Sequence, residues 1–236
     1  MPGTMKRLQV EVWSDIACPW CYIGKRRLEA AIARFPHGAA VDVVWRAFEL
    51  DPSAPRVRDR SVSYADRLAK KYGMPAAQAK LALERMTATA AGDGLEFHFE
   101  RVQSGNTFDA HRVLHLALER GLQNAVKERF LRAYMTEGEP IGEPETLMRL
   151  ASEAGLGAAE VRVVLTSDAY GAEVRADEEK ARAAGITGVP FFVLGGRYAV
   201  SGAQSADVLL EALAQAWAAK VEAPAGEGAV CGPDGC

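Results

Sequence analysis

The 236-residue sequence predicts an α/β fold made of a βαβ half and a ββα half, with a large all-helical insertion between them. Three observations lead to this prediction. Near the N-terminus, an apolar run, a helical pattern and a second apolar run follow one another. Near the C-terminus, two short apolar runs flank a Gly-Gly pair and precede a last helical pattern. Between these ends lies a long stretch rich in Ala, Leu, Glu and Arg.

The N-terminal half contains two predicted strands and the helix that connects them. The apolar runs Leu8 to Trp13 and Val41 to Phe48 are typical of strands. Between them, apolar residues in the segment Tyr22 to Phe35 recur at three- and four-residue spacing, which predicts a helix. A right-handed crossover through this helix makes the two strands parallel.

The insertion extends from about Asp51 to Ile186 and is predicted to be helical. Its apolar residues recur at helical spacing, and Gly- and Pro-containing breaks divide it into segments of about helix length. One such segment is Phe108 to Arg120, and either Asn106 or Thr107 just before it is expected to cap the helix.

The C-terminal half begins where Val189-Pro190 enters an apolar run. Gly195-Gly196 and a second run, Arg197 to Ser201, complete a predicted β-hairpin, and Ser205 to Val221 is the expected closing helix. A proline at this point fits a cis peptide bond, but the sequence leaves the isomer open. The predicted organisation is therefore discontinuous, with residues 6–50 and 186–221 in one domain, residues 51–185 in a helical subdomain and residues 222–236 in a flexible tail.

Two thiols separated by two residues, in Cys18-Pro19-Trp20-Cys21, follow the first strand and stand at the mouth of the first helix. Unpaired backbone N–H groups and the helix dipole at that position are expected to lower the pKa of Cys18, which makes Cys18 the predicted nucleophile. Cys21 lies one turn further and is the predicted resolving thiol. Half a zinc site and a structural disulfide are the alternatives, but neither explains the strand–helix context.

A tryptophan, an aspartate and two histidines are considered for further roles. Trp20 is expected to form an exposed contact surface for an apolar client. Asp15 is placed to move protons to and from a thiol or simply to cap the loop. His111 and His115 are four residues apart on one helix face, but no glutamate or cysteine accompanies them, so no metal site is assigned. Helix packing is the expected role of His115, and Glu49 is left out of the catalytic set.

The composition is that of a folded protein, with 49% hydrophobic residues, 25% charged residues and a net charge of −3. No basic stripe for nucleic acid is present, and Lys25-Arg26-Arg27 is interpreted as a solvated helix face. No apolar run is long enough to span a membrane, and no apolar signal core precedes the first strand, so a cytoplasmic location is expected. In that reducing compartment, isomerisation or reduction is favoured over net oxidation.

Several linked motifs resemble the DsbA-type oxidoreductases of the thioredoxin fold, and among them the FrnE-like subfamily. The resemblance covers residues from about 8 to 219. The motifs that carry it are D-I-A-C-P-W-C-Y-I-G from Asp15, F-E-L from Phe48, N-T-F-D-A-H-R from Asn106 and G-V-P-F-F from Gly188.

The resemblance implies a protein disulfide isomerase or dithiol–disulfide oxidoreductase that needs no cofactor and acts on protein thiol or disulfide clients. Glutathione or a thioredoxin system would be its redox partner. It implies that Val189 and Pro190 face the two cysteines and pair with the bound client chain. Pro19, Asn106 and His111 are further candidates for active-site lining.

Two alternatives remain open at this point. One is a glutathione-dependent transferase or isomerase acting on small molecules in an apolar pocket of the insertion. Kappa-class glutathione transferases and 2-hydroxychromene-2-carboxylate isomerases resemble this architecture but carry serine at the first cysteine position, whereas this chain keeps both cysteines. The other is a cysteine metal-binding or holdase-like protein.

A second thiol pair, Cys231 and Cys236, ends the chain with a P-D-G turn between its members. Three interpretations compete for it. The pair acts as an auxiliary dithiol that relays electrons to or from Cys18 and Cys21, it joins them in a four-thiolate metal site, or it is an inert terminus.

Overall fold

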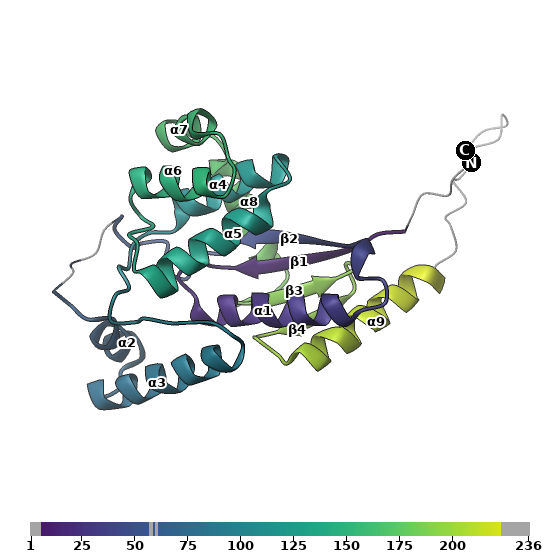
Figure 1. Cartoon of the computed structure of the whole chain (residues 1–236), viewed down its shortest axis with the longest axis horizontal. Helices are drawn as coiled ribbons and strands as arrows, with labels where there is room; N and C mark the ends of the chain where they lie inside the picture. Colours follow the sequence, from purple (N-terminus) through teal and green to yellow (C-terminus); the bar gives the residue numbers. More distant parts are fainter. Residues whose placement is uncertain (1–5, 57–58, 60, 223–236) are drawn as a thin grey trace.

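The protein is built on a four-stranded sheet, and the computed structural model describes residues 6–56, 59 and 61–222. The strand order is β2-β1-β3-β4 (Figure 1). Strand β1 (Leu8–Ser14) is parallel to β2 (Val41–Ala47) and antiparallel to β3 (Phe191–Leu194), which forms a hairpin with β4 (Tyr198–Ser201). The predicted βαβ and ββα halves are therefore both present and share one sheet.

Helices α1 (Pro19–Arg34) and α9 (Ala206–Glu222) pack against each other and cover the same side of the sheet (Figure 1). A short 3₁₀ turn, Gly38–Ala40, leads from α1 to β2. Apolar side chains from β1, β3 and both helices form one core, which includes Val10, Leu28, Phe192, Leu209 and Leu213. Alternate residues of a strand and the apolar stripe of a helix supply such a core.

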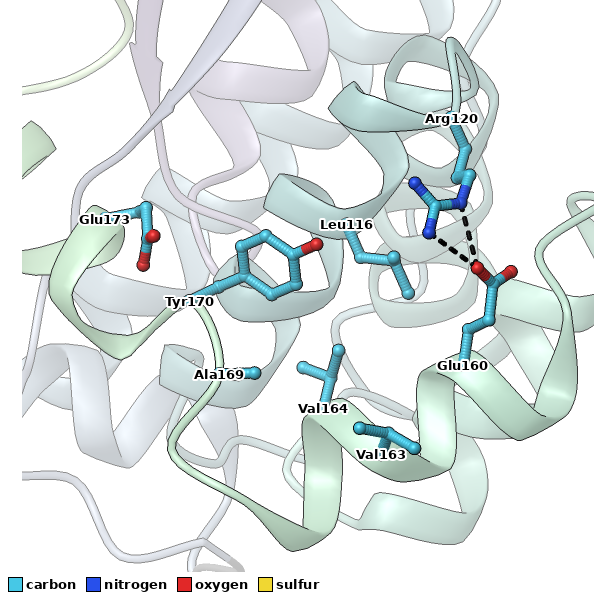
Figure 2. A pocket seen from close by; sticks show the side chains of 8 residues that line it. All are labelled: Leu116, Arg120, Glu160, Val163, Val164, Ala169, Tyr170 and Glu173. Carbon is cyan, nitrogen blue, oxygen red and sulfur yellow. Dashed lines mark hydrogen bonds and ion pairs between the residues drawn. The ribbon is translucent and has the colours of Figure 1, made fainter.

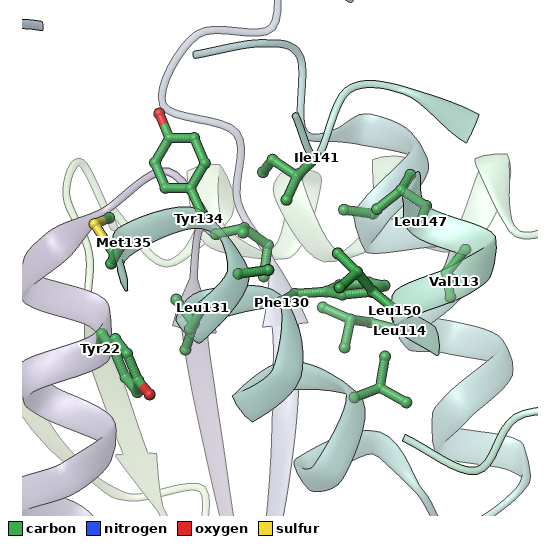
Figure 3. Packing of buried hydrophobic residues seen from close by; sticks show 14 of the residues in the cluster. Tyr22, Val113, Leu114, Phe130, Leu131, Tyr134, Met135, Ile141, Leu147 and Leu150 are labelled. Carbon is green, nitrogen blue, oxygen red and sulfur yellow. The ribbon is translucent and has the colours of Figure 1, made fainter. Parts of the chain in front are cut away.

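The insertion is helical throughout the residues that the structure describes. Its elements are α2 (Tyr64–Tyr72), α3 (Ala76–Gly92), α4 (Phe108–Glu119), α5 (Gln123–Arg132), a π-helical turn (Ala133–Glu137), α6 (Pro144–Glu153), α7 (Ala158–Thr166) and α8 (Gly171–Ala183). A second apolar core forms among these helices, and Tyr22 of α1 lies in it beside residues of the insertion such as Leu131 and Met135 (Figure 3). Helix α1 thus contributes its first turns to one core and its later turns to the other.

Two insertion helices are fastened to the backbone of β2 by polar side chains. Gln123, at the start of α5, accepts a hydrogen bond from Trp45 N–H and donates one to Trp45 C=O, both 2.9 Å long. Asp177 of α8 accepts the Ala47 N–H at 2.9 Å, and its carbonyl oxygen accepts the Trp13 indole N–H at 2.9 Å. Because β2 is an edge strand, these bonds satisfy backbone groups that no further strand pairs with.

The first helix begins at Pro19, directly after Cys18 and three residues before the apolar periodicity starts at Tyr22, because proline is well tolerated at the first helical position. One sequence expectation changes in the structure. The solvated interpretation of Lys25 is wrong: its side chain is 1% exposed, and its ammonium pairs with Glu29 at 2.5 Å and with Glu128 of α5 at 2.6 Å. Within the described ranges, no helix is both long and apolar enough to cross a bilayer.

Helix α1 lies close to Pro190 and to strand β3 at Gly24. A methyl group there would lie 2.9 Å from Pro190 Cγ and 3.2 Å from Phe192 Cζ. Only a residue without a side chain lets the helix pack this close to Pro190. The distance between the dithiol and Pro190 therefore depends on Gly24.

We expect Gly24→Ala to lower the free energy of unfolding by about 1–3 kcal/mol, because the added methyl overpacks this contact. Gly92→Ala is the matched control, since a methyl group on that helical glycine meets nothing within 4 Å. The control should leave stability unchanged or raise it slightly. Urea unfolding of both variants measures the difference, and equal stability of Gly24→Ala and wild type would contradict the packing argument.

Candidate active site

The first helix begins at the dithiol, as the sequence predicts. Cys18 is the N-cap residue of α1, Pro19 is its first residue, and Cys21 N–H donates to Cys18 C=O at 3.0 Å. Both cysteines are free thiols. The side chain of Cys18 is 4% exposed and that of Cys21 is 0% exposed, so Cys18 is the more accessible of two buried sulfurs.

The Val189-Pro190 segment lies directly against Cys18, although some 170 residues separate the two in sequence. Cys18 Sγ donates a hydrogen bond to Val189 C=O at 3.6 Å, and the Val189-Pro190 peptide bond is cis. Trp20, with 40% of its surface exposed, stands next to them at the protein surface. The structure therefore places Val189 against Cys18, as the resemblance implied, while the role of Trp20, Val189 and Pro190 in binding a client stays a prediction.

The two thiols titrate as a coupled pair. The hydrogen bond with Cys21, together with burial, raises the pKa of Cys18 well above its ordinary value. Burial opposes the Cys21 thiolate, but the hydrogen bond from Cys18 and the positive charge of Lys127 outweigh burial and lower the pKa of Cys21. The predicted lowering of the Cys18 pKa is therefore wrong for this conformation, because the hydrogen bond with Cys21 and burial both oppose the Cys18 thiolate.

Lys127 is a charged neighbour of the dithiol that the sequence analysis missed. It lies on α5 and is fully buried, and its ammonium donates to Ser14 C=O at 3.5 Å. Burial lowers its pKa to about 8, against the opposing effect of the charges of Cys21, Asp15 and Cys18. In sequence, Lys127 is one lysine among the many charged residues of the insertion, and no motif marks it.

Asp15 lies at the junction of three segments beside the dithiol. Its carboxylate accepts Ala17 N–H at 3.3 Å and Leu50 N–H at 2.8 Å, and it faces His111 Nε2 of α4 at 3.4 Å. Burial opposes its charge, but His111, Leu50 N–H and the Thr107 side chain hold the pKa of Asp15 below its usual value. Asp15 caps the loop, and it also joins His111 to the site, which places two predicted lining residues in contact.

The remaining predicted lining residue, Asn106, connects α4 to Glu49. Its amide oxygen accepts Phe108 N–H at 2.8 Å, so Asn106 binds the first N–H of α4 although Thr107 is the N-cap residue and makes no side-chain cap bond. Its amide nitrogen donates to Glu49 Oε1 at 3.3 Å. Burial raises the pKa of Glu49 although Arg175 pairs with its other oxygen at 2.6 Å. Glu49, which the sequence analysis set aside, is thus part of the polar lining that leads to Asp15.

No group of three or more His, Cys, Asp or Glu side chains suited to a metal ion occurs in the described part of the chain. His115 instead contacts Asp177 Oδ2 at 3.1 Å and stacks on Tyr170, which is a packing role. Cys231 and Cys236 lie outside the described residues.

A separate cavity of about 440 Å³ lies in the insertion between α4, α7 and the start of α8 (Figure 2). Its floor is apolar, and an ion pair between Arg120 and Glu160, 2.7 Å long, stands at one side. None of the predicted site residues lines this cavity.

We expect Asp15→Asn to lower the free energy of unfolding near neutral pH by about 1–3 kcal/mol, because an amide has one acceptor oxygen and leaves a buried N–H unpaired. The folded-state pKa of Asp15 lies below its usual value, so the carboxylate stabilises the fold fully above about pH 5. This contribution is lost as the pH falls through the lowered pKa.

Denaturant unfolding between pH 3 and pH 7 should therefore show the gap between wild type and Asp15→Asn closing toward acid pH. Asp42→Asn, at an exposed carboxylate paired with Arg7, is the control and should change stability little. Curves that stay parallel down to pH 3 would show that the Asp15 charge does not stabilise the fold.

Comparison with known proteins places this site in a family. A family model described as a DSBA-like thioredoxin domain matches residues 9–214. A protein from Streptomyces coelicolor described as a probable DsbA oxidoreductase is 46% identical, and its crystal structure matches 98% of both chains with a TM-score of 0.87. The uncharacterized protein YwbO of Bacillus subtilis (strain 168) is 31% identical over 212 residues, which are 87% of this chain and 96% of YwbO.

A more distant structure shows the same fold. The cytosolic disulfide reductase DsbM of Pseudomonas aeruginosa is 22% identical, with a TM-score of 0.54 over 90% of this chain and 97% of DsbM. The predicted DsbA-like thioredoxin fold with a helical insertion is thereby confirmed, while membership of the FrnE-like subfamily stays a prediction. The sheet, the dithiol at the start of α1 and the match over residues 9–214 agree: the chain belongs to the family of DSBA-like thioredoxin domains.

Proposed function

We propose that this protein is a thiol–disulfide oxidoreductase that exchanges disulfides with protein clients, using Cys18 as nucleophile and Cys21 as resolving thiol. One observation carries the proposal. Two free thiols lie within one turn at the start of α1, and the outer sulfur faces the backbone carbonyl of Val189. The similarity to the S. coelicolor protein described as a DsbA oxidoreductase supports it.

The proposed reaction has two exchange steps. Cys18, as thiolate, attacks a client disulfide, forms a mixed disulfide and releases one client thiolate. Cys21 then loses its proton and attacks Cys18 Sγ, which forms the Cys18–Cys21 disulfide and releases the second client thiol. Two electrons and the Cys21 proton pass from enzyme to client, the first client thiolate takes its proton from solvent, and the reverse sequence oxidises a client dithiol. Because the thiols share a proton, Cys18 reaches its thiolate form when that proton moves to Cys21.

The surface beside the dithiol suits an extended, apolar client. Trp20 and Leu50 are large apolar side chains that remain 40% and 37% exposed, and both adjoin the site, since Leu50 N–H is bound to Asp15. The Val189-Pro190 segment offers backbone groups beside Cys18 for a client strand. Unfolded or misfolded proteins present apolar segments of this kind.

The small-molecule alternative has less support. An apolar cavity does exist in the insertion, but neither cysteine nor any other predicted site residue lines it. A glutathione-dependent reaction at that cavity would leave the dithiol without a role. Activity that persists with the dithiol blocked and requires glutathione would favour this alternative.

We expect Cys21→Ser to accumulate a mixed disulfide between Cys18 and a disulfide-containing protein, because the second exchange step is removed. Cys18→Ser should form no such adduct and should lose catalysed reduction of the client. Non-reducing electrophoresis and mass spectrometry of the adduct provide the measurement. An adduct formed equally by both variants would show that Cys18 is not the entering nucleophile.

The direction of exchange is a further part of the proposal, and we favour isomerase or reductase activity with glutathione or a thioredoxin system restoring the enzyme in the cytoplasm. The reduction potential of the Cys18–Cys21 pair tests this. A value of about −180 to −120 mV is typical of isomerases and oxidants, and about −270 mV of reductases.

Measuring the same potential with Cys231 and Cys236 replaced by serine tests the proposed auxiliary pair, because a changed potential or turnover would connect these two cysteines to the dithiol.

A further inference from the structure

Two lysines are buried in the described part of the chain, and they differ sharply in their partners. Lys25 is 1% exposed and pairs with Glu29 and Glu128. Lys127 is 0% exposed, and no carboxylate in the described ranges lies within ion-pair distance of it. Its polar contact is the Ser14 carbonyl at 3.5 Å, and its ammonium lies 5.7 Å from the centre of the Trp45 ring. A buried ammonium without a carboxylate is costly to the fold, which calls for an explanation.

The charged groups around Lys127 come from the dithiol and its loop. Cys21, Asp15 and Cys18 favour its ammonium form, whereas burial and the like charge of Lys25 on α1 oppose it. The negative charge of Asp15 is already shared with His111 and two backbone N–H groups. Cys21, as thiolate, is therefore the main counter-charge for the Lys127 ammonium. Burial lowers the pKa of Lys127 to about 8, so the neutral amine forms readily near neutral pH.

Ser14 lies between the two groups. Its carbonyl accepts the bond from Lys127, while its side chain adjoins Cys21 and helps to lower the pKa of that thiol. The Ser14 hydroxyl is completely buried and has no well-formed hydrogen bond among the described residues. Lys127, Ser14 and Cys21 thus form a short polar path within an otherwise apolar interior.

Cys21 has no exposed surface through which to give its proton to water. The resolving step nevertheless requires that proton to leave, since only the thiolate attacks a disulfide efficiently. A base inside the protein meets this requirement. Lys127 is a buried basic side chain that interacts electrostatically with Cys21 and contacts Ser14, whose side chain adjoins that thiol.

We propose that Lys127 is the proton acceptor for Cys21 in the resolving step and the proton donor to Cys21 when the enzyme disulfide is reduced; this inference rests on the exchange reaction proposed above. The neutral amine takes the Cys21 proton as the sulfur attacks Cys18 Sγ, the Cys18–Cys21 bond forms, and the bond between Cys18 and the client breaks. The client sulfur leaves with the electron pair, and the proton held by Lys127 passes to it or to solvent. In the reverse direction, the ammonium protonates the departing Cys21 thiolate.

The test is the rate of the resolving step in Lys127→Met. The control is Lys180→Met, at a lysine of α8 that pairs with Glu11 and whose ammonium lies 5.4 Å from the centre of the Trp13 ring. A mixed disulfide with a labelled peptide forms on Cys18, and release of the peptide is followed in a single turnover. Positioned proton transfer contributes about 100-fold or more to a rate, so Lys127→Met should slow release by about that factor. Lys180→Met should release the peptide at the wild-type rate.

The pH profile provides a readout that a structural role would not move. The neutral fraction of Lys127 rises with pH through its pKa of about 8, so wild-type release should accelerate between about pH 7 and pH 9. In Lys127→Met this rise should shift to higher pH, because the Cys21 thiol loses both its base and the cation that lowers its pKa. Denaturant unfolding should show Lys127→Met to be at least as stable as wild type, since an unpaired buried charge is removed.

Lys127→Arg separates proton acceptance from charge alone, because arginine keeps the cation and does not act as a base. Slow release in this variant supports the proposal, and release at the wild-type rate in either Lys127 variant overturns it. Formation of the first mixed disulfide, measured with Cys21→Ser in a chain that keeps Lys127, tests the exchange reaction separately from the resolving step. Failure of that first step would refute the exchange reaction itself, whereas a normal first step with unchanged release would refute only the role of Lys127.

Discussion

Burial of the dithiol is the constraint on which the rest of the site depends. Two thiols and a carboxylate, Asp15, sit almost without solvent at the start of α1, so every charge that forms there must be met by protein groups. Asp15 meets this demand by binding Ala17 N–H, Leu50 N–H and His111, which also ties the first loop to the end of β2 and to α4. The same contacts that allow a buried charge therefore fix the geometry of the loop that carries Cys18.

The helical insertion supplies some of the charged and polar side chains around the dithiol. His111 of α4 and Lys127 of α5 approach the dithiol from the insertion, while Asp15 and the cysteines come from the sheet and α1. Gln123 and Asp177 fasten insertion helices to the β2 backbone, and Lys25 of α1 pairs with Glu128, the residue after Lys127. These cross-connections hold the α5 lysine in place, because the neighbouring side chains of one helix move together with it.

The surroundings of Cys18 differ on its two sides. Toward the surface, Cys18 faces the Val189 carbonyl, and the exposed Trp20 follows two residues along the chain. Toward the interior, Cys18 and Cys21 titrate together, and the positive charge of Lys127 lowers the pKa of Cys21. In the proposed exchange reaction, client binding and proton movement would therefore depend on different groups.

Local periodicity, turn residues and linked motifs were enough to predict the two sheet halves, the dithiol at the start of α1 and the hairpin at Gly195-Gly196. The charges at the site depend instead on tertiary packing. Lys25 and Lys127 belong to stretches that look solvated in sequence, yet both are buried, Lys25 beside Glu128 of α5 and Lys127 beside Ser14 of β1 and Trp45 of β2. The Cys18 pKa likewise depends on which groups surround the coupled thiols, since desolvation and Coulomb interactions act between residues that are distant along the chain and adjacent in space.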